Sequence, residues 1–239
     1  MKLLLSAACI VLFATGCVYT FKKTIHGDGN VTTSERNISS VHRIKCSGHY
    51  DVQLTQGSPT SVKITADQNL QSYIVTDING DELNIHYQHD VNLDPSQKIK
   101  IEVVTDKLEG FELNGAGDVN TTNKFTGGDE LDLDIAGTGN IHFDVNTPSI
   151  NSSISGTGDI YISGETRNSK INIAGAGNYH AEDLKSENAK IEIAGTGDVH
   201  LFADSTLDIN IAGVGKVFYS GNPTITQSIA GSGKIKKEE

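Results

Sequence analysis

The heptapeptide Ile135-Ala-Gly-Thr-Gly-Asn-Ile141 occurs seven times, with small changes, in the second half of the chain. Each copy contains a Gly-x-Gly core followed by a polar residue and then an apolar one. The glycine pairs are Gly115 and Gly117, Gly137 and Gly139, Gly156 and Gly158, Gly175 and Gly177, Gly195 and Gly197, Gly213 and Gly215, and Gly231 and Gly233. Successive copies are 18 to 22 residues apart, and self-similarity at that period is typical of a solenoid, in which each repeat forms one turn.

The residues around the glycines alternate as β-strands do. The positions two before and four after the first glycine are apolar, and the position three before it is polar. A period of two predicts strands with one buried and one wet face. The apolar columns are Leu113, Ile135, Ile154, Ile173, Ile193, Ile211 and Ile229, and Val119, Ile141, Ile160, Tyr179, Val199, Val217 and Ile235. We therefore predict an all-β fold, a parallel β-helix whose turns stack about 4.8 Å apart.

The polar residue after the second glycine forms a further column. It reads Asp118, Asn140, Asp159, Asn178, Asp198, Lys216 and Lys234. Charged and neutral side chains alternate, which avoids repulsion between neighbouring strands, so we expect a hydrogen-bonded ladder at a bend. The alternative is a set of calcium sites, but calcium-binding Gly-x-Gly-x-Asp repeats have a nine-residue period. The glycines are expected to be structural, supplying a positive φ or a close approach of neighbouring backbones.

The first residues have the pattern of an export signal. A basic residue and a short apolar run end in Ala14-Thr-Gly-Cys17, which resembles the bacterial lipobox. That resemblance implies that residues 1–16 are a signal peptide and that Cys17 is lipidated. The alternative is an ordinary signal cleaved near Gly16. Because Val18 rather than Asp follows the cysteine, the resemblance to enteric-type sorting implies the outer membrane.

The other cysteines leave no internal disulfide. Cys9 lies in the signal, so Cys46 is the single thiol left in the mature chain, and we expect it to be buried rather than a nucleophile. It opens Cys46-Ser-Gly-His-Tyr-Asp-Val52, which we interpret as a degenerate copy of the motif.

The domain organisation follows from these patterns. We expect a polar tether over 17–35 and one solenoid domain over 36–239. Its divergent N-terminal part, 36–108, contains irregular strands and a cap, and the regular repeats cover 109–235. The alternative is a domain boundary near residue 109.

Several stretches together resemble a bacterial family, the "putative auto-transporter adhesin, head GIN domain". They are Glu35-Arg-Asn-Ile-Ser-Ser, Ile44-Lys-Cys-Ser-Gly-His-Tyr-Asp-Val-Gln-Leu-Thr-Gln-Gly57, Ile64-Thr-Ala-Asp-Gln-Asn-Leu70 and the Gly-x-Gly repeats. The resemblance covers residues 36 to 235. It implies a β-helix similar in shape to pectin lyases, on exported and often lipid-anchored proteins, without an assigned catalytic set.

The position five after each first glycine is the best candidate for a binding surface. This column, expected to face outward, is Asn120, His142, Tyr161, His180, His200, Phe218 and Lys236. We predict a surface binding stripe at Tyr161, His180 and His200, because aromatic rings can lie flat on sugars. His180 and His200 on adjacent turns could also share a metal ion, but a structural zinc site needs about four ligands, so we expect no metal and no cofactor.

Charge and residue placement narrow the function. A net charge of −11 disfavours nucleic acid. The repeats contain a single arginine, Arg167, and their carboxylates are dispersed rather than gathered as a glycosidase requires. We expect a non-catalytic, lipid-anchored envelope scaffold that binds a protein or glycan in adhesion. The alternatives are a periplasmic protein-interaction module and a polysaccharide-acting β-helix enzyme. Self-association through the terminal turns is a further expectation.

Overall fold

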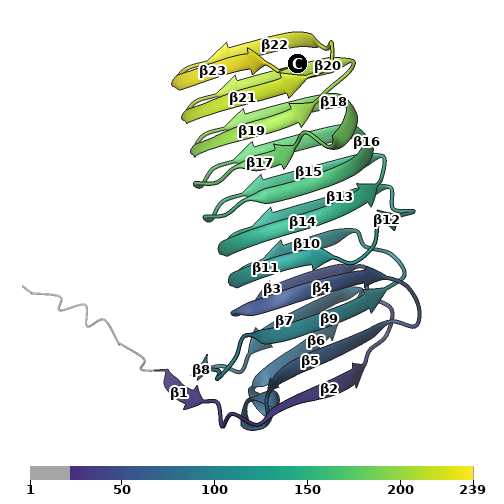
Figure 1. Cartoon of the computed structure of the whole chain (residues 1–239), viewed down its shortest axis with the longest axis vertical. Coiled ribbons are helices and arrows are strands. Elements are labelled where there is room, and N and C mark those ends of the chain that lie inside the picture. The colour runs from purple at the N-terminus through teal and green to yellow at the C-terminus, as the bar shows by residue number, and fades with distance from the viewer. Residues whose placement is uncertain (1–21, 239) are drawn as a thin grey trace, which may run out of the picture.

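The computed structural model describes residues 22–238, and these form a β-solenoid of about 6 turns (Figure 1). The predicted fold class is therefore confirmed. The signal peptide of residues 1–16, the lipidation site Cys17 and the first residues of the expected tether lie outside the described residues.

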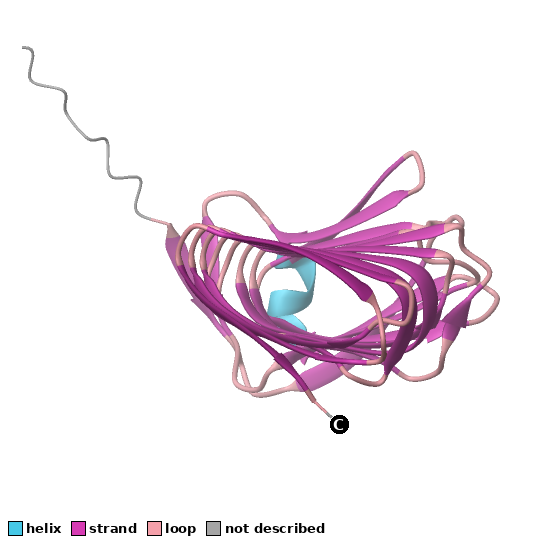
Figure 2. Cartoon of the chain, turned by 90° about the horizontal axis from the view of Figure 1, so that it is seen from above, coloured by secondary structure: helices cyan, strands magenta, loops and turns pink. Residues whose placement is uncertain are grey.

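Two stacks of parallel strands form the walls of the solenoid, and its cross-section is a flattened oval (Figure 2). The first stack consists, in order, of β7 (Glu82–Tyr87), β3 (Arg43–Ser47), β10 (Gly110–Leu113), β13 (Glu130–Ile135), β15 (Ser149–Ile154), the second half of β16 (Ile160–Ile173), β18 (Leu184–Ile193), β20 (Thr206–Ile211) and β22 (Thr224–Ile229). The second consists of β9 (Ile99–Thr105), β4 (Tyr50–Gln56), β11 (Ala116–Thr121), β14 (Thr138–Asn146), the first half of β16, β17 (Tyr179–Ala181), β19 (Thr196–Phe202), β21 (Val214–Ser220) and β23 (Ser232–Lys237). The short β12 (Phe125–Thr126) pairs with the end of β14.

The two predicted apolar columns face each other across the interior. Every member up to Val217 is at most 1% exposed, so each turn is closed by the turns on either side. Ile229 is 42% exposed, and Ile235 is only partly buried, because no described strand covers the last turn. Burial of one such side chain contributes about 1.5–3 kcal/mol.

The glycine corners bring neighbouring backbones into contact. A Cβ atom at Gly175 would overlap the carbonyl oxygen of Gly156, and the same overlap recurs at the corresponding glycine of each later turn. Gly117 also has a φ of +132°, but Gly177 and the later glycines of that column do not have a positive φ. Close approach, rather than backbone handedness, is therefore the main reason for glycine at these corners.

The polar column forms the ladder that the sequence predicts. Asn140 donates from Nδ2 to Asp118 Oδ1 at 3.0 Å, and Asn178 donates from its backbone N–H to Asp159 Oδ1 at 2.7 Å. The pattern continues through Asp198 to the backbone N–H of Lys216. The Asp side chains of this column thus accept hydrogen bonds from N–H groups of the next turn, as expected for half-buried polar groups.

The N-terminal part continues the same solenoid. Cys46 pairs in register with Leu113 and Val52 with Val119, which places Gly48 at the first-glycine position. The degenerate copy is therefore confirmed, and both strand stacks run through residue 109 without a break. Cys46 is buried, as expected.

An antiparallel cap closes the N-terminal end. It contains β2 (Val31–Asn37), β5 (Ser61–Asp67), β6 (Ile74–Asn79) and the 3₁₀ helix η1 (Gln68–Tyr73), which lies across the opening (Figure 2). Beside the cap, β1 (Lys23–His26) pairs with β8 (Val91–Asp94). The expected tether over 17–35 is thus wrong for residues 23–26 and 31–35, because their backbone groups pair with strands of the domain. Among residues 22–238, no helix has the length and apolarity needed to cross a membrane.

Candidate functional site

Five rings from successive turns stack on the outer face of the second strand stack. His142 and Tyr161 have ring centroids 4.4 Å apart, Tyr161 and His180 4.5 Å, His180 and His200 5.6 Å, and His200 and Phe218 4.5 Å. All four pairs lie within 14° of parallel. We call these five residues the ring ladder.

Backbone register builds the ring ladder. His142 pairs with Tyr161, Tyr161 with His180, and His180 with His200 in adjacent parallel strands. Parallel strands lie about 4.8 Å apart, which is close to the spacing of stacked aromatic rings. The predicted residues Tyr161, His180 and His200 therefore do lie together, and the ladder extends to His142 and Phe218 at its ends.

The stacking decides which parts of the rings a ligand can reach. The two faces of the Tyr161 ring are covered, one by His142 and the other by His180. A sugar therefore cannot lie flat on Tyr161 in the way predicted from the sequence. A ligand can therefore reach only the ring edges. The site is therefore suited to hydrogen bonding rather than to stacking on an aromatic face.

A groove of about 280 Å³ runs beside the ladder. Its lining contains the edges of His142, Tyr161 and His180, the hydroxyls of Thr121 and Ser163, and the carboxylates of Asp144, Glu182 and Asp183. These groups offer a row of hydrogen-bond acceptors to hydroxyl or amine donors. Glu182 and Asp183 reach the groove because they directly follow β17, the strand that contains His180.

The polar groups in and around the groove differ in their partners. Lys124 Nζ lies 3.3 Å from Asp144 Oδ1, both partly exposed. The Tyr161 hydroxyl lies 3.5 Å from Asp159 Oδ2, and desolvation followed by the nearby carboxylates of Asp159 and Glu182 raises the pKa of Tyr161. The phenol therefore remains a neutral donor. Arg167 does not reach the groove and lies 4.0 Å from Glu187 on an exposed surface.

The imidazoles of His180 and His200 are placed poorly for a shared metal ion. Their rings are 13° from parallel and 5.6 Å apart, so their in-plane lone pairs run side by side instead of converging. His200 Nδ1 lies 3.6 Å from Glu238 Oε2 of the last described turn.

Sequence reasoning missed part of this site. His142 and Phe218 belong to the same outward column as the three predicted residues, so their place in the ladder could have been predicted from that column. Asp144 could not be found in that way, because its place opposite Ser163 depends on the length of β14.

The comparisons with known proteins agree with this architecture. A family model described as "Putative auto-transporter adhesin, head GIN domain" matches residues 41–223. A crystal structure of a putative adhesin from Bacteroides fragilis has a TM-score of 0.85 at 24% identity, covering 90% of this chain and 100% of its own.

Two structures from Parabacteroides are also similar. A putative lipid binding protein from Parabacteroides distasonis has a TM-score of 0.69 at 27% identity, and a putative adhesin from Parabacteroides merdae has 0.70 at 22%. Each covers 91% of this chain and 100% of its own. No curated protein matches the chain in sequence.

Proposed function

Because the chain belongs to the putative auto-transporter adhesin, head GIN domain family, we propose that it is a non-catalytic binding scaffold of the bacterial cell envelope that acts in adhesion. The observation that carries the proposal is the groove beside the ring ladder. It is the place where outward-facing rings, hydroxyls and carboxylates from several turns come together.

The ligand we propose is a glycan or a protein segment rich in hydroxyl or amine groups. The acceptors of Asp144, Glu182 and Asp183 complement such donors, and the net charge of −11 favours a neutral or cationic partner over nucleic acid. The ligand would lie along the ring edges, spanning several turns. A rigid wall of paired strands keeps these groups in place before binding, which limits the entropy cost of association.

Lipid anchoring at Cys17 is the second part of the proposal. It is supported by the lipobox-like Ala14-Thr-Gly-Cys17. It is also supported by the position of β1, the first described strand, which lies at the capped end of the solenoid (Figure 1). An anchor there would leave the ring ladder free. The proposed location is the outer membrane, at its periplasmic or outer face.

Ligand binding is tested with a triple variant. Tyr161→Ala, His180→Ala and His200→Ala together should abolish retention on a glycan array or on immobilised cell-surface material. A matched variant, Asn172→Ala with Asn210→Ala, changes the exposed column of the opposite strand stack and should bind as the wild type does. Equal retention of the triple variant and the wild type would reject the ring ladder as the site. Release of cleaved sugar from a bound glycan would instead favour the enzyme alternative.

Location is tested by protease treatment of intact cells. Loss of the domain would place it on the surface, where adhesion can occur, whereas protection until lysis would favour a periplasmic interaction module. Cys17→Ser should release the protein from the membrane fraction. Continued membrane association of this variant would contradict anchoring by lipid.

Self-association through the terminal turn is a further proposal. Ile225 and Ile229 of the edge strand β22 are 37% and 42% exposed, and β22 has no charged side chain. Unpaired edge strands of this kind favour pairing between chains. Sedimentation should show a concentration-dependent dimer that Ile229→Lys removes. A monomer at all concentrations would reject this contact.

A further inference from the structure

Three potential metal ligands lie in register at the junction of the N-terminal part and the repeats. Asp81, His42 and Glu109 each directly precede a strand of the first stack, namely β7, β3 and β10. Their backbones are joined: the His42 N–H donates to the Asp81 carbonyl at 2.9 Å, and the Glu109 N–H donates to the His42 carbonyl at 2.7 Å. The three side chains therefore leave neighbouring strands at the same height.

The side chains converge as well. One ring nitrogen of His42 and one carboxylate oxygen from each of Asp81 and Glu109 all lie within 4.8 Å of one another. His42 and Glu109 are half-buried, and Asp81 is exposed, so the cluster is open to solvent on one side. Atoms at these separations can reach a common ion with small side-chain rotations, because Zn–N and Zn–O bonds are about 2.0–2.2 Å.

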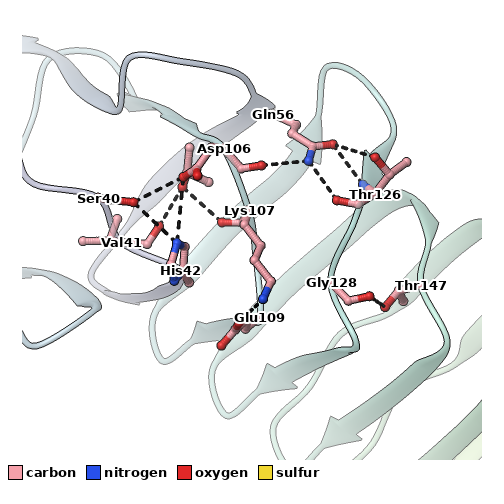
Figure 3. Close-up of polar contacts among 11 residues, drawn as sticks. Ser40, Val41, His42, Gln56, Asp106, Lys107, Glu109, Thr126, Gly128 and Thr147 are labelled. Carbon is pink, nitrogen blue, oxygen red and sulfur yellow. Dashed lines mark hydrogen bonds and ion pairs between the residues drawn. The ribbon is translucent and has the colours of Figure 1, made fainter.

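Neighbouring groups orient the imidazole. His42 Nε2 lies 3.4 Å from the Ser40 hydroxyl and 3.9 Å from Asp106 Oδ1, and the Ser40 hydroxyl donates to Asp106 Oδ1 at 3.3 Å (Figure 3). A histidine that binds a metal commonly has a carboxylate or hydroxyl beside its ring in this way.

The backbone on both sides of the cluster is also held firmly. The buried hydroxyl of Thr105 lies 2.6 Å from the carbonyl oxygen of Val41 and 3.1 Å from that of Lys107. Val41 precedes His42, and Lys107 comes two residues before Glu109. The Thr105 hydroxyl thus helps to hold the backbone next to two of the three ligands, His42 and Glu109.

One cation already competes for the site. Lys107 Nζ lies 2.5 Å from Glu109 Oε1 (Figure 3). Arg43 pairs directly with Asp132, with its Nη2 2.7 Å from Asp132 Oδ2, although its charge also acts on Asp81 and Glu109. Three carboxylates, of Asp81, Asp106 and Glu109, therefore surround His42 with one nearby lysine that a divalent ion would displace.

We propose that His42, Asp81 and Glu109 bind a divalent transition-metal ion, Zn²⁺ being the expected one. An imidazole together with two carboxylates favours zinc and related ions over Mg²⁺ or Ca²⁺, which prefer oxygen ligands alone. Water would complete the coordination. Because Asp81 and His42 belong to the N-terminal part and Glu109 to the first repeat, the ion would tie three adjacent strands together across residue 109.

The test is Zn²⁺ titration of the mature protein purified from the cell envelope and stripped with EDTA, followed by calorimetry. We expect one ion per chain and a rise in melting temperature on binding. His42→Ala should abolish both, and Asp106→Asn, which removes an orienting group, should weaken binding by roughly 10-fold. Lys107→Met should strengthen binding, because it removes the competing cation.

Matched controls separate this site from other histidines. His180→Ala and His200→Ala should bind Zn²⁺ as the wild type does. Circular dichroism before metal addition establishes that each variant is folded, and Lys107→Met provides a test even if a ligand variant fails to fold. Absence of stoichiometric binding, or affinity unchanged in His42→Ala, would overturn the proposal. Weaker binding in Lys107→Met would overturn it as well.

Discussion

The rings of Tyr161 and His180 lie face to face, with centroids 4.5 Å apart and planes 5° from parallel. The two residues are direct partners in adjacent parallel strands, so strand spacing sets their separation. Stacking and backbone pairing therefore stabilise the same register. The other ring pairs of the ladder are also nearly parallel, but their centroid distances range from 4.4 to 5.6 Å.

Removal of the central ring should expose this coupling. Tyr161→Ala loses contacts with both His142 and His180, and we expect it to lower the free energy of unfolding by about 1–3 kcal/mol, as aromatic pairs contribute about 0.5–1.5 kcal/mol each beyond area burial. Tyr161→Phe keeps the ring and should unfold close to the wild type. Urea denaturation of both variants is the measurement. Equal destabilisation of the two would show that the hydroxyl, not the stack, matters.

Substitution at a glycine corner should be severe. Gly175→Val places a Cβ inside the carbonyl oxygen of Gly156, and overpacking of this kind costs about 1–3 kcal/mol or more. Ala176→Val is the control, because Ala176 is exposed and Val214 already occupies the equivalent position in a later turn. Thermal unfolding should separate the two variants clearly. An unchanged melting temperature for Gly175→Val would contradict the close-packed corner.

The Cys46 thiol should be inert in the folded protein. Its side chain is fully buried, and desolvation raises its pKa to about 12, so the reactive thiolate is absent at neutral pH. A form beginning at Val18 contains no other cysteine. Iodoacetamide should label it only after denaturation. Rapid labelling of the native form would show that the first turn opens readily.

Acid should weaken the N-terminal cap through Asp67. This buried carboxylate accepts hydrogen bonds from the Ser96 N–H at 2.9 Å, the Ser96 hydroxyl at 2.5 Å and the Gly29 N–H at 2.8 Å. Desolvation alone would raise its pKa, but the hydrogen bonds from Ser96 and Gly29 outweigh it and the pKa is lowered. A lowered pKa stabilises the fold above the unfolded value of about 3.9, and that stability is lost as pH falls through the folded value.

Asp67→Asn should therefore lower the free energy of unfolding by about 2–3 kcal/mol at pH 7, because hydrogen bonds to a charged group are lost. At pH 3 the difference in the free energy of unfolding between the variant and the wild type should be smaller, because the wild type has then lost part of the stability that the charged Asp67 provides. Urea unfolding at the two pH values measures it, with exposed Asp208→Asn as the control. A difference that does not change with pH would exclude the charge of Asp67 as its source.

The repeats were predictable because each turn repeats the same local chemistry. The columns that contain Ile135 and Ile141 needed only the period of the motif, and the placement of Tyr161, His180 and His200 followed from the same alignment. The orientation of the rings did not follow, because whether an outward ring shows its face or its edge depends on the neighbouring ring.

The N-terminal part was less predictable. The strand Val31–Asn37 is polar and reads as a tether, and only its antiparallel partner Ser61–Asp67 makes it part of the cap. The convergence of His42, Asp81 and Glu109 likewise depends on irregular loops between strands, so no spacing in the chain announces it. Long-range strand pairing decides both features.

The entry of the chain beside the capped end gives the solenoid a direction. Six intervals separate the seven motif copies, and at ~4.8 Å for each interval the last corner stands about 29 Å beyond the first. Duplication or loss of one repeat would move the outermost groups by a single fixed step and leave the cap untouched. The distance from the capped end to the last turn can therefore change during evolution in steps of one turn, without a change in the side chains that each turn exposes.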